Sequence, residues 1–439
     1  MSMKLFREGT RGIREISGSL LFVENVREGG YGELVSIETD SGPRMGQILQ
    51  AGDDLCVVRV FDGTEGLETG RTTVWLERDV MKVGVGEGLR GQVLNGRGQP
   101  LNGGRLFGLE ALLPIGGLPI DPARRRVPDV ALETGISSLD LMNTLVLGQN
   151  LPIFAPPGLP ADRLATWIAR RTTVFDRTRQ AERSRFLLVF AALGVTNREA
   201  DRFMSAFYED DAVQNGIFLL NTAGDSAAER LLTPRIALTI AEYFAFVRGD
   251  DVMVIMTDML RYCDALREIG AEETSGRRGP MHADLAEIYE RSGCVRGGTG
   301  SVTLLPVITV PNDDMTRLSG CIGEGQIVLD RRLHEMGIFP PVDVLSSQSR
   351  LMNGAIGRGR TFESHGALAD QLYAACAKVG ELRRLRRTVG DDALSDEEKR
   401  CLSFGERFEK SFLAQNETRR SFAESEKAAR EALSALSPD

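Results

Sequence analysis

Five short runs of apolar residues lie between residues 130 and 345, separated by longer segments with helical periodicity. The runs are LPIFA (151–155), RFLLVFAAL (185–193), GIFLLNT (216–222), DVMVIMT (251–257) and SVTLLPVITV (301–310). Their apolar residues are consecutive rather than alternate, which is typical of strands that are buried on both faces. The pattern therefore predicts a central α/β domain with a mainly parallel sheet that is covered by helices on both sides.

The sequence on either side of this core has a different pattern. Residues 1–75 contain short apolar or alternating stretches separated by Gly, Asp and Pro, which predicts a small β-barrel. Near the carboxyl terminus the pattern is helical, and Ser395 with Glu398 three residues later is typical of a helix start. We expect three domains: a β-barrel (1–75), an α/β domain with a glycine-rich, β-rich first part (76–355) and a helical bundle (356–439).

One helix of the α/β region has clear end signals in the sequence. Thr233 can serve as the N-cap, and Pro234 suits the first helical position. Between Pro234 and Gly249, apolar residues recur at helical spacing at Ile236, Ile240 and Phe244. The sequence thus predicts a helix that begins at Pro234 and ends before Gly249.

Length, charge and composition exclude several functional classes. A chain of 439 residues is long enough for two or three domains with a sizeable core. The formal net charge of −9 argues against broad nucleic-acid binding, which needs a clustered positive surface. No apolar run approaches the roughly 18 to 20 residues of a membrane helix, and the amino terminus lacks a secretory signal. We therefore expect a cytoplasmic protein.

The cysteines and histidines form no recognisable disulfide or metal pattern. The six cysteines are far apart and contain no Cys-x-x-Cys pair, and there are only three histidines. We expect neither a disulfide framework nor a metal site. The residues concerned are Cys56, Cys263, Cys294, Cys321, Cys376 and Cys401, with His282, His334 and His365.

The loop after the first apolar run is unusual in its proline content. A phosphate-binding P-loop, G-x-x-x-x-G-K-[ST], holds phosphate with backbone N–H groups and a Lys, and magnesium with a hydroxyl. Here Ala161 takes the lysine position and Asp162 the hydroxyl position. The prolines remove N–H donors, and a carboxylate would repel phosphate. We interpret the segment as a stiff, degenerate P-loop that binds no nucleotide, formed by Ala155, Pro156, Pro157, Gly158, Pro160, Ala161 and Asp162.

Longer stretches of the chain resemble a known family. They include TGISSLDLMNTLVLGQNLPIF, GVTNREADRFM, LLTPRIALTIAEYFA, ALREIGA, GEGQIVLDRRLHEMGIFPPVDVL and SRLMNGAIGRGRT. Nearly end to end, the chain resembles the non-catalytic B subunits of V-type and A-type rotary ATPases. The resemblance implies a RecA-like central domain with a P-loop-type fold. A barrel that starts almost at residue 1 is more typical of bacterial or archaeal members.

The resemblance also implies which catalytic positions are lost. Where catalytic subunits of these machines carry Gly-Glu-Arg after the second strand, this chain reads Gly194-Val195-Thr196-Asn197, without a carboxylate at that position. Asp258 has the form of a Walker B aspartate, but without the lysine and hydroxyl it has no metal–nucleotide pair to complete. We therefore expect Asp258 to be vestigial or to cap a helix.

One catalytic group remains, and the resemblance implies that it acts on a neighbouring subunit. It is the arginine of a Ser-Arg-Leu-Met-Asn segment, here Arg350. The implied partners are a catalytic A subunit in an alternating A3B3 ring, central-stalk (D/F-type) subunits and peripheral-stalk (E/G-type) subunits. ATP or ADP and Mg would be bound mainly by the A subunit. The chain would meet a membrane only through the complex, which couples ATP synthesis or hydrolysis to proton or sodium transport.

Two departures from the family pattern leave alternatives open. The loops after Gly279 and Thr316 are shorter than in family members, which bears on contacts with the central stalk. One alternative is a catalytically competent hexameric ATPase of the same fold: a catalytic ring subunit, a secretion-type ATPase or an RNA-translocating one. The absent lysine and carboxylate count against it. The other is a stand-alone, nucleotide-independent binding module, which the shortened loops favour.

Overall fold

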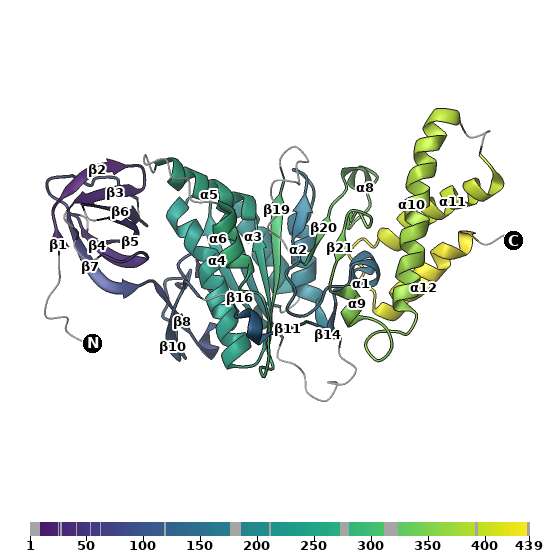
Figure 1. Ribbon diagram of the computed structural model, residues 1–439, viewed down its shortest axis with the longest axis horizontal. Coiled ribbons are helices and arrows are strands. Elements are labelled where there is room, and N and C mark those ends of the chain that lie inside the picture. The colour runs from purple at the N-terminus through teal and green to yellow at the C-terminus, as the bar shows by residue number, and fades with distance from the viewer. Residues whose placement is uncertain are drawn as a thin grey trace.

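The computed structural model consists of three regions that follow one another along its long axis (Figure 1). A β-barrel lies at one end, helices lie at the other, and an α/β domain lies between them. The structure describes residues 9–24, 26, 29–40, 42–52, 54–61, 63–117, 120–175, 186–209, 212–272, 281–310, 324–390 and 394–436.

The amino-terminal region is a seven-stranded antiparallel sheet. Its strands are β1 (Gly9–Thr10), β2 (Ile13–Ser17), β3 (Leu20–Glu24), β4 (Glu33–Glu38), β5 (Arg44–Ala51), β6 (Leu55–Val60) and β7 (Thr73–Val80). They pair in the order β1-β7-β4-β5-β6-β3-β2, and Leu21, Ile37 and Val58 are among the fully buried side chains between them. This confirms the predicted barrel, since alternate apolar residues turn to one interior.

The central region contains one large, mainly parallel sheet. Its strands are β9 (Val93–Asn95), β11 (Arg125–Arg126), β13 (Ile153–Ala155), β15 (Phe186–Val195), β16 (Gly216–Thr222), β17 (Asp251–Thr257), β18 (Gly293–Val295), β19 (Ser301–Thr309), β20 (Gly325–Val328) and β21 (Gln348–Ser349). The main order is β21-β20-β13-β19-β17-β15-β16-β9, in which all pairs except β21–β20 are parallel. The predicted α/β fold class is confirmed.

Both faces of this sheet are buried. Along β15, Leu188 and Phe190 belong to one apolar cluster, whereas Leu187 and Val189 belong to the other. This arrangement explains why the strands are apolar at consecutive positions. Two smaller ribbons flank the sheet: β8 (Lys82–Val85) with β10 (Ala111–Pro114), and β12 (Ala131–Glu133) with β14 (Thr173–Phe175).

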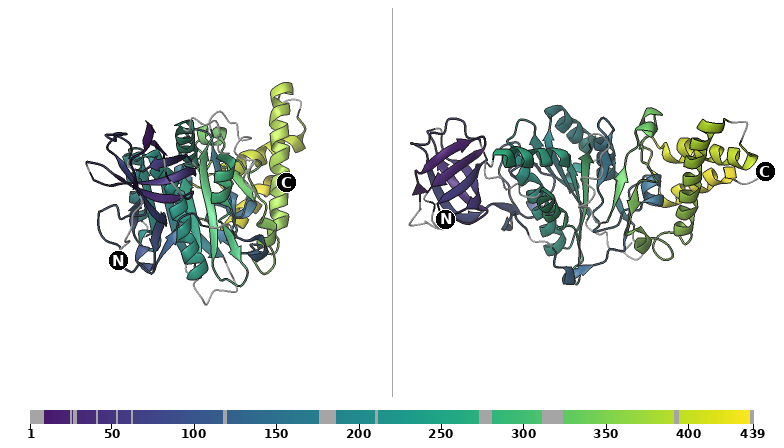
Figure 2. Two further views of the ribbon diagram at one scale, coloured as in Figure 1. Left: turned by 60° about the vertical axis from the view of Figure 1, so that its left-hand side comes forward. Right: turned by 45° about the horizontal axis from the view of Figure 1, so that its top comes forward.

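Helices cover the two faces of the sheet (Figure 2). The helices of this region are α1 (Ser137–Met142), α2 (Ala161–Arg171), α3 (Asn197–Glu209), α4 (Ala227–Glu242), α5 (Met259–Glu272), α6 (Met281–Tyr289), α8 (Arg331–Glu335) and α9 (Met352–Ala355). Leu164 of α2 and Phe203 of α3 join the cluster on one face. Ile236 of α4 and Tyr262 of α5 join the cluster on the other. The sheet is thus held between two helical layers, as the alternation of patterns predicts.

The prediction that a helix begins at Pro234 is wrong. The helix α4 begins at Ala227, and the N-cap hydroxyl of Ser226 accepts the N–H of Glu229 at 3.1 Å. Pro234 lies inside this helix, and the Thr233 hydroxyl donates to the carbonyl of Glu229 at 3.0 Å instead of capping. The turns before Pro234 are buried in the core, and this packing outweighs the hydrogen bond that a proline removes.

The carboxyl-terminal region is helical, as predicted. It contains α10 (His365–Val389), α11 (Asp396–Arg407), a π-helical turn (Phe408–Leu413) and α12 (Phe422–Leu433). The predicted start at Ser395 is confirmed, because the Ser395 hydroxyl accepts the N–H of Glu398, whose carboxylate accepts the N–H of Ser395 at 2.7 Å. Within the described ranges, no helix combines the length and apolar character needed to cross a membrane.

Candidate functional site

The proline loop connects β13 with α2, and its backbone groups bond within the protein. The N–H of Ala161 donates to the carbonyl of Leu159 at 2.8 Å, and the N–H of Leu159 donates to that of Pro156 at 3.3 Å. A guanidinium nitrogen of Arg331 donates to the carbonyl of Pro157 at 3.0 Å. The amides of Leu159 and Ala161 therefore point at carbonyls instead of converging on an anion, as a phosphate cradle requires.

Asp162 stands in the first turn of α2, where the P-loop pattern has its hydroxyl. Its carboxylate accepts a hydrogen bond from the hydroxyl of Thr257, at the end of β17, over 2.6 Å. Removal from water raises the pKa of Asp162, and the nearby charges of Asp258 and Glu199 raise it further. A phosphate placed here would meet a carboxylate that already lies among other carboxylates.

Asp258 caps a helix and joins two segments of the domain. One carboxylate oxygen accepts the N–H of Leu260 in the first turn of α5 at 2.9 Å, and the N–H of Thr309 at the end of β19 at 3.1 Å. The bond from Leu260 is the helix cap that the capping interpretation of Asp258 requires, and the bond from Thr309 connects α5 to the end of β19.

The segment that follows β15 carries a carboxylate one helical turn beyond the position considered in the sequence. Glu199 accepts the N–H of Thr196 at 2.7 Å and lies 3.8 Å from Arg261, which also donates to the carbonyl of Gly194 at 2.6 Å. Burial acts to raise the pKa of Glu199, but the Thr196 hydrogen bonds and the charge of Arg261 outweigh it and lower the pKa. Glu199 is therefore an ionised helix cap.

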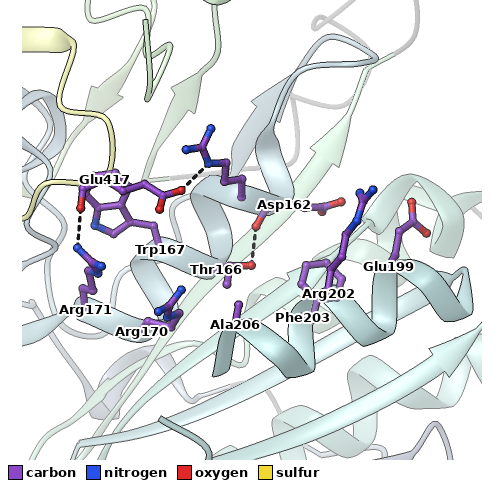
Figure 3. Close-up of a pocket in the computed structure, with 11 residues that line it drawn as sticks. Asp162, Thr166, Trp167, Arg170, Arg171, Glu199, Arg202, Phe203, Ala206 and Glu417 are labelled. Atoms are coloured by element: carbon purple, nitrogen blue, oxygen red, sulfur yellow. Dashed lines mark hydrogen bonds and ion pairs between the residues drawn. The ribbon is translucent and has the colours of Figure 1, made fainter. Parts of the chain in front are cut away.

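A cavity of about 310 Å³ lies between α2 and α3 (Figure 3). Glu417 closes one side of it: the carboxylate accepts from Arg163, and the carbonyl accepts from Arg171 at 2.7 Å. The Arg163 guanidinium stacks 3.9 Å from the ring centroid of Phe339, and that of Arg171 lies 5.4 Å from Trp167. The sequence does not predict this cavity, because its walls come from three distant segments. Arg163 and Arg171 are engaged by these neighbours rather than open to a phosphate.

Arg350 lies at the edge of the main sheet. It directly follows β21, its side chain is exposed, and its N–H donates to the carbonyl of Glu324 at 3.0 Å. In the register of the strands, Ser349 is opposite Gly325 at the start of β20, and Ile327 of β20 is opposite Ile153 of β13. Arg350 therefore lies beyond the amino-terminal ends of β20 and β13, whereas the proline loop follows the carboxyl-terminal end of β13.

Among the residues that the structure describes, no group of three His, Cys, Asp or Glu side chains could hold a metal ion. Five cysteines are free thiols: Cys56, Cys263, Cys294, Cys376 and Cys401. Cys321 and the shortened loops after Gly279 and Thr316 lie outside the described residues.

Three family models match consecutive parts of the chain. Residues 13–74 match the β-barrel domain of the ATP synthase alpha/beta family, and residues 135–349 match its nucleotide-binding domain. Residues 354–439 match the C-terminal domain of V and A type ATP synthase. V-type ATP synthase beta chains from two strains of Thermus thermophilus are each 46% identical over 435 residues, covering 96% of this chain and 91% of theirs. The chain belongs to the V/A-type branch of the ATP synthase alpha/beta family.

Within this family the chain groups with the beta, or B, subunits, which confirms the expectation of a non-catalytic subunit. A solved structure, the ATP synthase subunit NeqB from Nanoarcheaum equitans, is 34% identical. The two structures superpose with a TM-score of 0.75. The superposed part covers 96% of this chain and all of the NeqB chain. The likeness of this B subunit to its relatives thus extends through all three regions.

Proposed function

We propose that this B subunit alternates with catalytic A subunits in an A3B3 ring and supplies Arg350 to a neighbour's ATP. The observation that carries the proposal is the position of Arg350 relative to the chain's own loop. The proline loop lies at the carboxyl-terminal end of β13, and Arg350 lies beyond the opposite end of the neighbouring strand β20. An exposed arginine at that end of the sheet is away from its own loop, which supports action on a partner's nucleotide.

An arginine can promote phosphoryl transfer without holding the nucleotide itself. The guanidinium is planar, remains ionised and can meet two oxygens at once. In the proposed ring, the A subunit binds ATP or ADP with magnesium, and Arg350 stabilises the charge that develops on the transferring group. Interactions that strengthen in the transition state raise kcat rather than ground-state affinity. We therefore assign Arg350 to turnover and not to nucleotide binding.

The chain's own loop supports this division of labour. Ala161 provides no positive charge at the lysine position, and Asp162 places a carboxylate where phosphate and magnesium would meet. Arg163, which could have approached a phosphate, is paired with Glu417. We therefore expect no ATP hydrolysis by the isolated B subunit. The same features of the loop disfavour the alternative of a catalytically competent hexameric ATPase.

The remaining partners follow from the family alone. We infer contacts with central-stalk (D/F-type) and peripheral-stalk (E/G-type) subunits. We also infer that the subunit is cytoplasmic and is attached to a membrane only through the other subunits of the complex. The complex would couple ATP synthesis or hydrolysis to proton or sodium transport, with the ion chosen by its membrane subunits. A stand-alone binding module remains an outcome of the following test, because such a protein would form no ring.

The proposal is tested in a ring reconstituted with the catalytic subunit. Arg350→Ala should lower kcat per assembled hexamer by about a thousandfold or more, because an arginine finger contributes on that order. Arg350→Lys, which keeps the charge but loses the planar fork, should also be strongly impaired. Arg105→Ala removes an exposed arginine from a distant loop and serves as the matched control. Normal hydrolysis by Arg350→Ala rings, hydrolysis by the isolated chain, or failure of the unmodified chain to form a ring would contradict the proposal.

A further inference from the structure

Gln149 is completely buried in the turn before β13, and its side-chain amide joins the two segments that hold Arg350. The amide oxygen accepts the N–H of Val146 at 3.1 Å. The amide nitrogen donates to the carbonyl of Glu324 and to the hydroxyl of Ser349, both at 3.0 Å. Ser349 immediately precedes Arg350, and the Glu324 carbonyl also accepts the N–H of Arg350. The backbone of Arg350 is thus attached to Ser349 by the peptide bond and to Glu324 by a hydrogen bond, and the Gln149 amide contacts both of these residues.

The acceptor carbonyls around this network indicate its donors and acceptors. The Glu324 carbonyl can only accept, so the amide nitrogen of Gln149 faces it. The Ser349 hydroxyl has the carbonyl of Thr144 as its nearer acceptor at 2.8 Å and the amide oxygen of Gln149 at 3.3 Å, and it accepts the amide N–H of Gln149. The backbone of Gln149 is itself held, because its N–H donates to Val146 at 3.0 Å and its carbonyl accepts from Leu304 at 2.9 Å. The side chain thus extends from a point anchored to β19, in the middle of the sheet.

The segment on the other side of the network is equally constrained. Glu324 accepts the N–H of Asn150, next to Gln149, through its carboxylate at 2.7 Å. The following residue, Gly325, has φ +131°, and a Cβ there would lie 2.0 Å from the carbonyl of Gln348. Only glycine fits this close approach of β20 and β21. Small shifts of Arg350 relative to the sheet are therefore opposed by main-chain and side-chain contacts together.

We propose that Gln149 is a positioning residue that sets the place of Arg350 for reaction with the neighbour's nucleotide. This inference rests on the proposed role of Arg350. Substitution Gln149→Met keeps the length of the side chain and removes both N–H donors, so that Ser349 and Glu324 lose their common partner. Because a displacement of about 1 Å in a catalytic group can cost about 100-fold in rate, a loosened attachment is sufficient for a large effect.

The test compares reconstituted rings that carry Gln149→Met, Arg350→Ala or both substitutions. Gln149→Met should lower kcat per assembled hexamer about 10- to 100-fold and leave KM for ATP nearly unchanged. In the Arg350→Ala background the same substitution should have little further effect, because no guanidinium remains to be positioned. Ser349→Ala removes one of the two amide bonds and should give a smaller loss, which keeps the test possible if Gln149→Met does not assemble.

Gln326→Met is the matched control, since Gln326 lies on β20 and its amide donates to the carbonyl of Ser346 at 3.0 Å rather than to Ser349 or Glu324. It should leave kcat unchanged. Normal kcat in Gln149→Met and Ser349→Ala rings, while Arg350→Ala is impaired, would overturn the positioning role and leave the proposed function standing. Losses that multiply in the double variant would also overturn it. Normal turnover of Arg350→Ala would overturn the proposed function and this inference with it.

Discussion

At the scale of the residue, one fully buried histidine lies at the contact between α10 and α1 of the α/β domain. His365 Nε2 lies 3.0 Å from the carbonyl of Leu141, which can only accept, so this nitrogen carries the hydrogen. Nδ1 then accepts the hydroxyl of Thr361 at 2.9 Å. The ring stacks on Phe362 with centroids 4.6 Å apart and meets the ring of Phe422 edge-on. Burial lowers the pKa of His365 to about 4, so the ring is neutral.

The unfolding of this region should therefore depend on pH. The pKa of His365 falls from its ordinary 6.5 to about 4 in the fold. The protonated form is favoured only after unfolding, so about 3 kcal/mol of stability, present above about pH 6.5, is lost as the pH falls towards about 4. Thermal unfolding measured between pH 7 and pH 4 should show a shallower pH dependence for His365→Gln. Equal slopes for His365→Gln and the unmodified protein would contradict the prediction.

At the scale of the element, sequence patterns predict the structure wherever their signals are local. The five apolar runs form β13, β15, β16, β17 and β19, because consecutive apolar residues are typical of strands that are buried on both faces. The helix start at Ser395 is also local, since cap and partner are three residues apart. The prediction that a helix starts at Pro234 fails because burial in the core stabilises α4 on both sides of the proline. The strands β20 and β21 read GQIV and QS, so they contain no such apolar run that would predict a strand before Arg350.

The cap of α11 provides a prediction at this scale. Ser395→Ala removes the hydroxyl that accepts the N–H of Glu398 and should lower the stability of the carboxyl-terminal region by about 1 kcal/mol. Ser411→Ala is the control, since the Ser411 hydroxyl only donates to the carbonyl of Arg407 within the same helical segment. Amide hydrogen exchange of residues 396–407 should accelerate in the first variant and remain unchanged in the second. Unchanged exchange in both would show that the cap does not limit opening.

At the scale of the whole molecule, the candidate site is assembled from segments far apart in the chain. The proline loop can be recognised because its positions follow one contiguous pattern, and Arg350 because a short motif surrounds it. Gln149 and Ser349 are 200 residues apart, and the cavity closed by Glu417 joins the α/β domain to the helical region. Such contacts have no local signature, so the sequence indicated the residue proposed to act, Arg350, and not the residues that hold it.

We propose that Arg350 meets the transferring phosphoryl group across a subunit interface. The most direct measurement is the retention of MgADP with aluminium fluoride, which imitates the phosphoryl group in transfer, by purified A3B3 rings. Transition-state analogues bind more tightly than substrates because they use contacts that the ground state does not make. Rings with Arg350→Ala should bind MgADP alone as the unmodified ring does but should fail to retain the fluoroaluminate complex. Equal retention of that complex by both rings would contradict the claim.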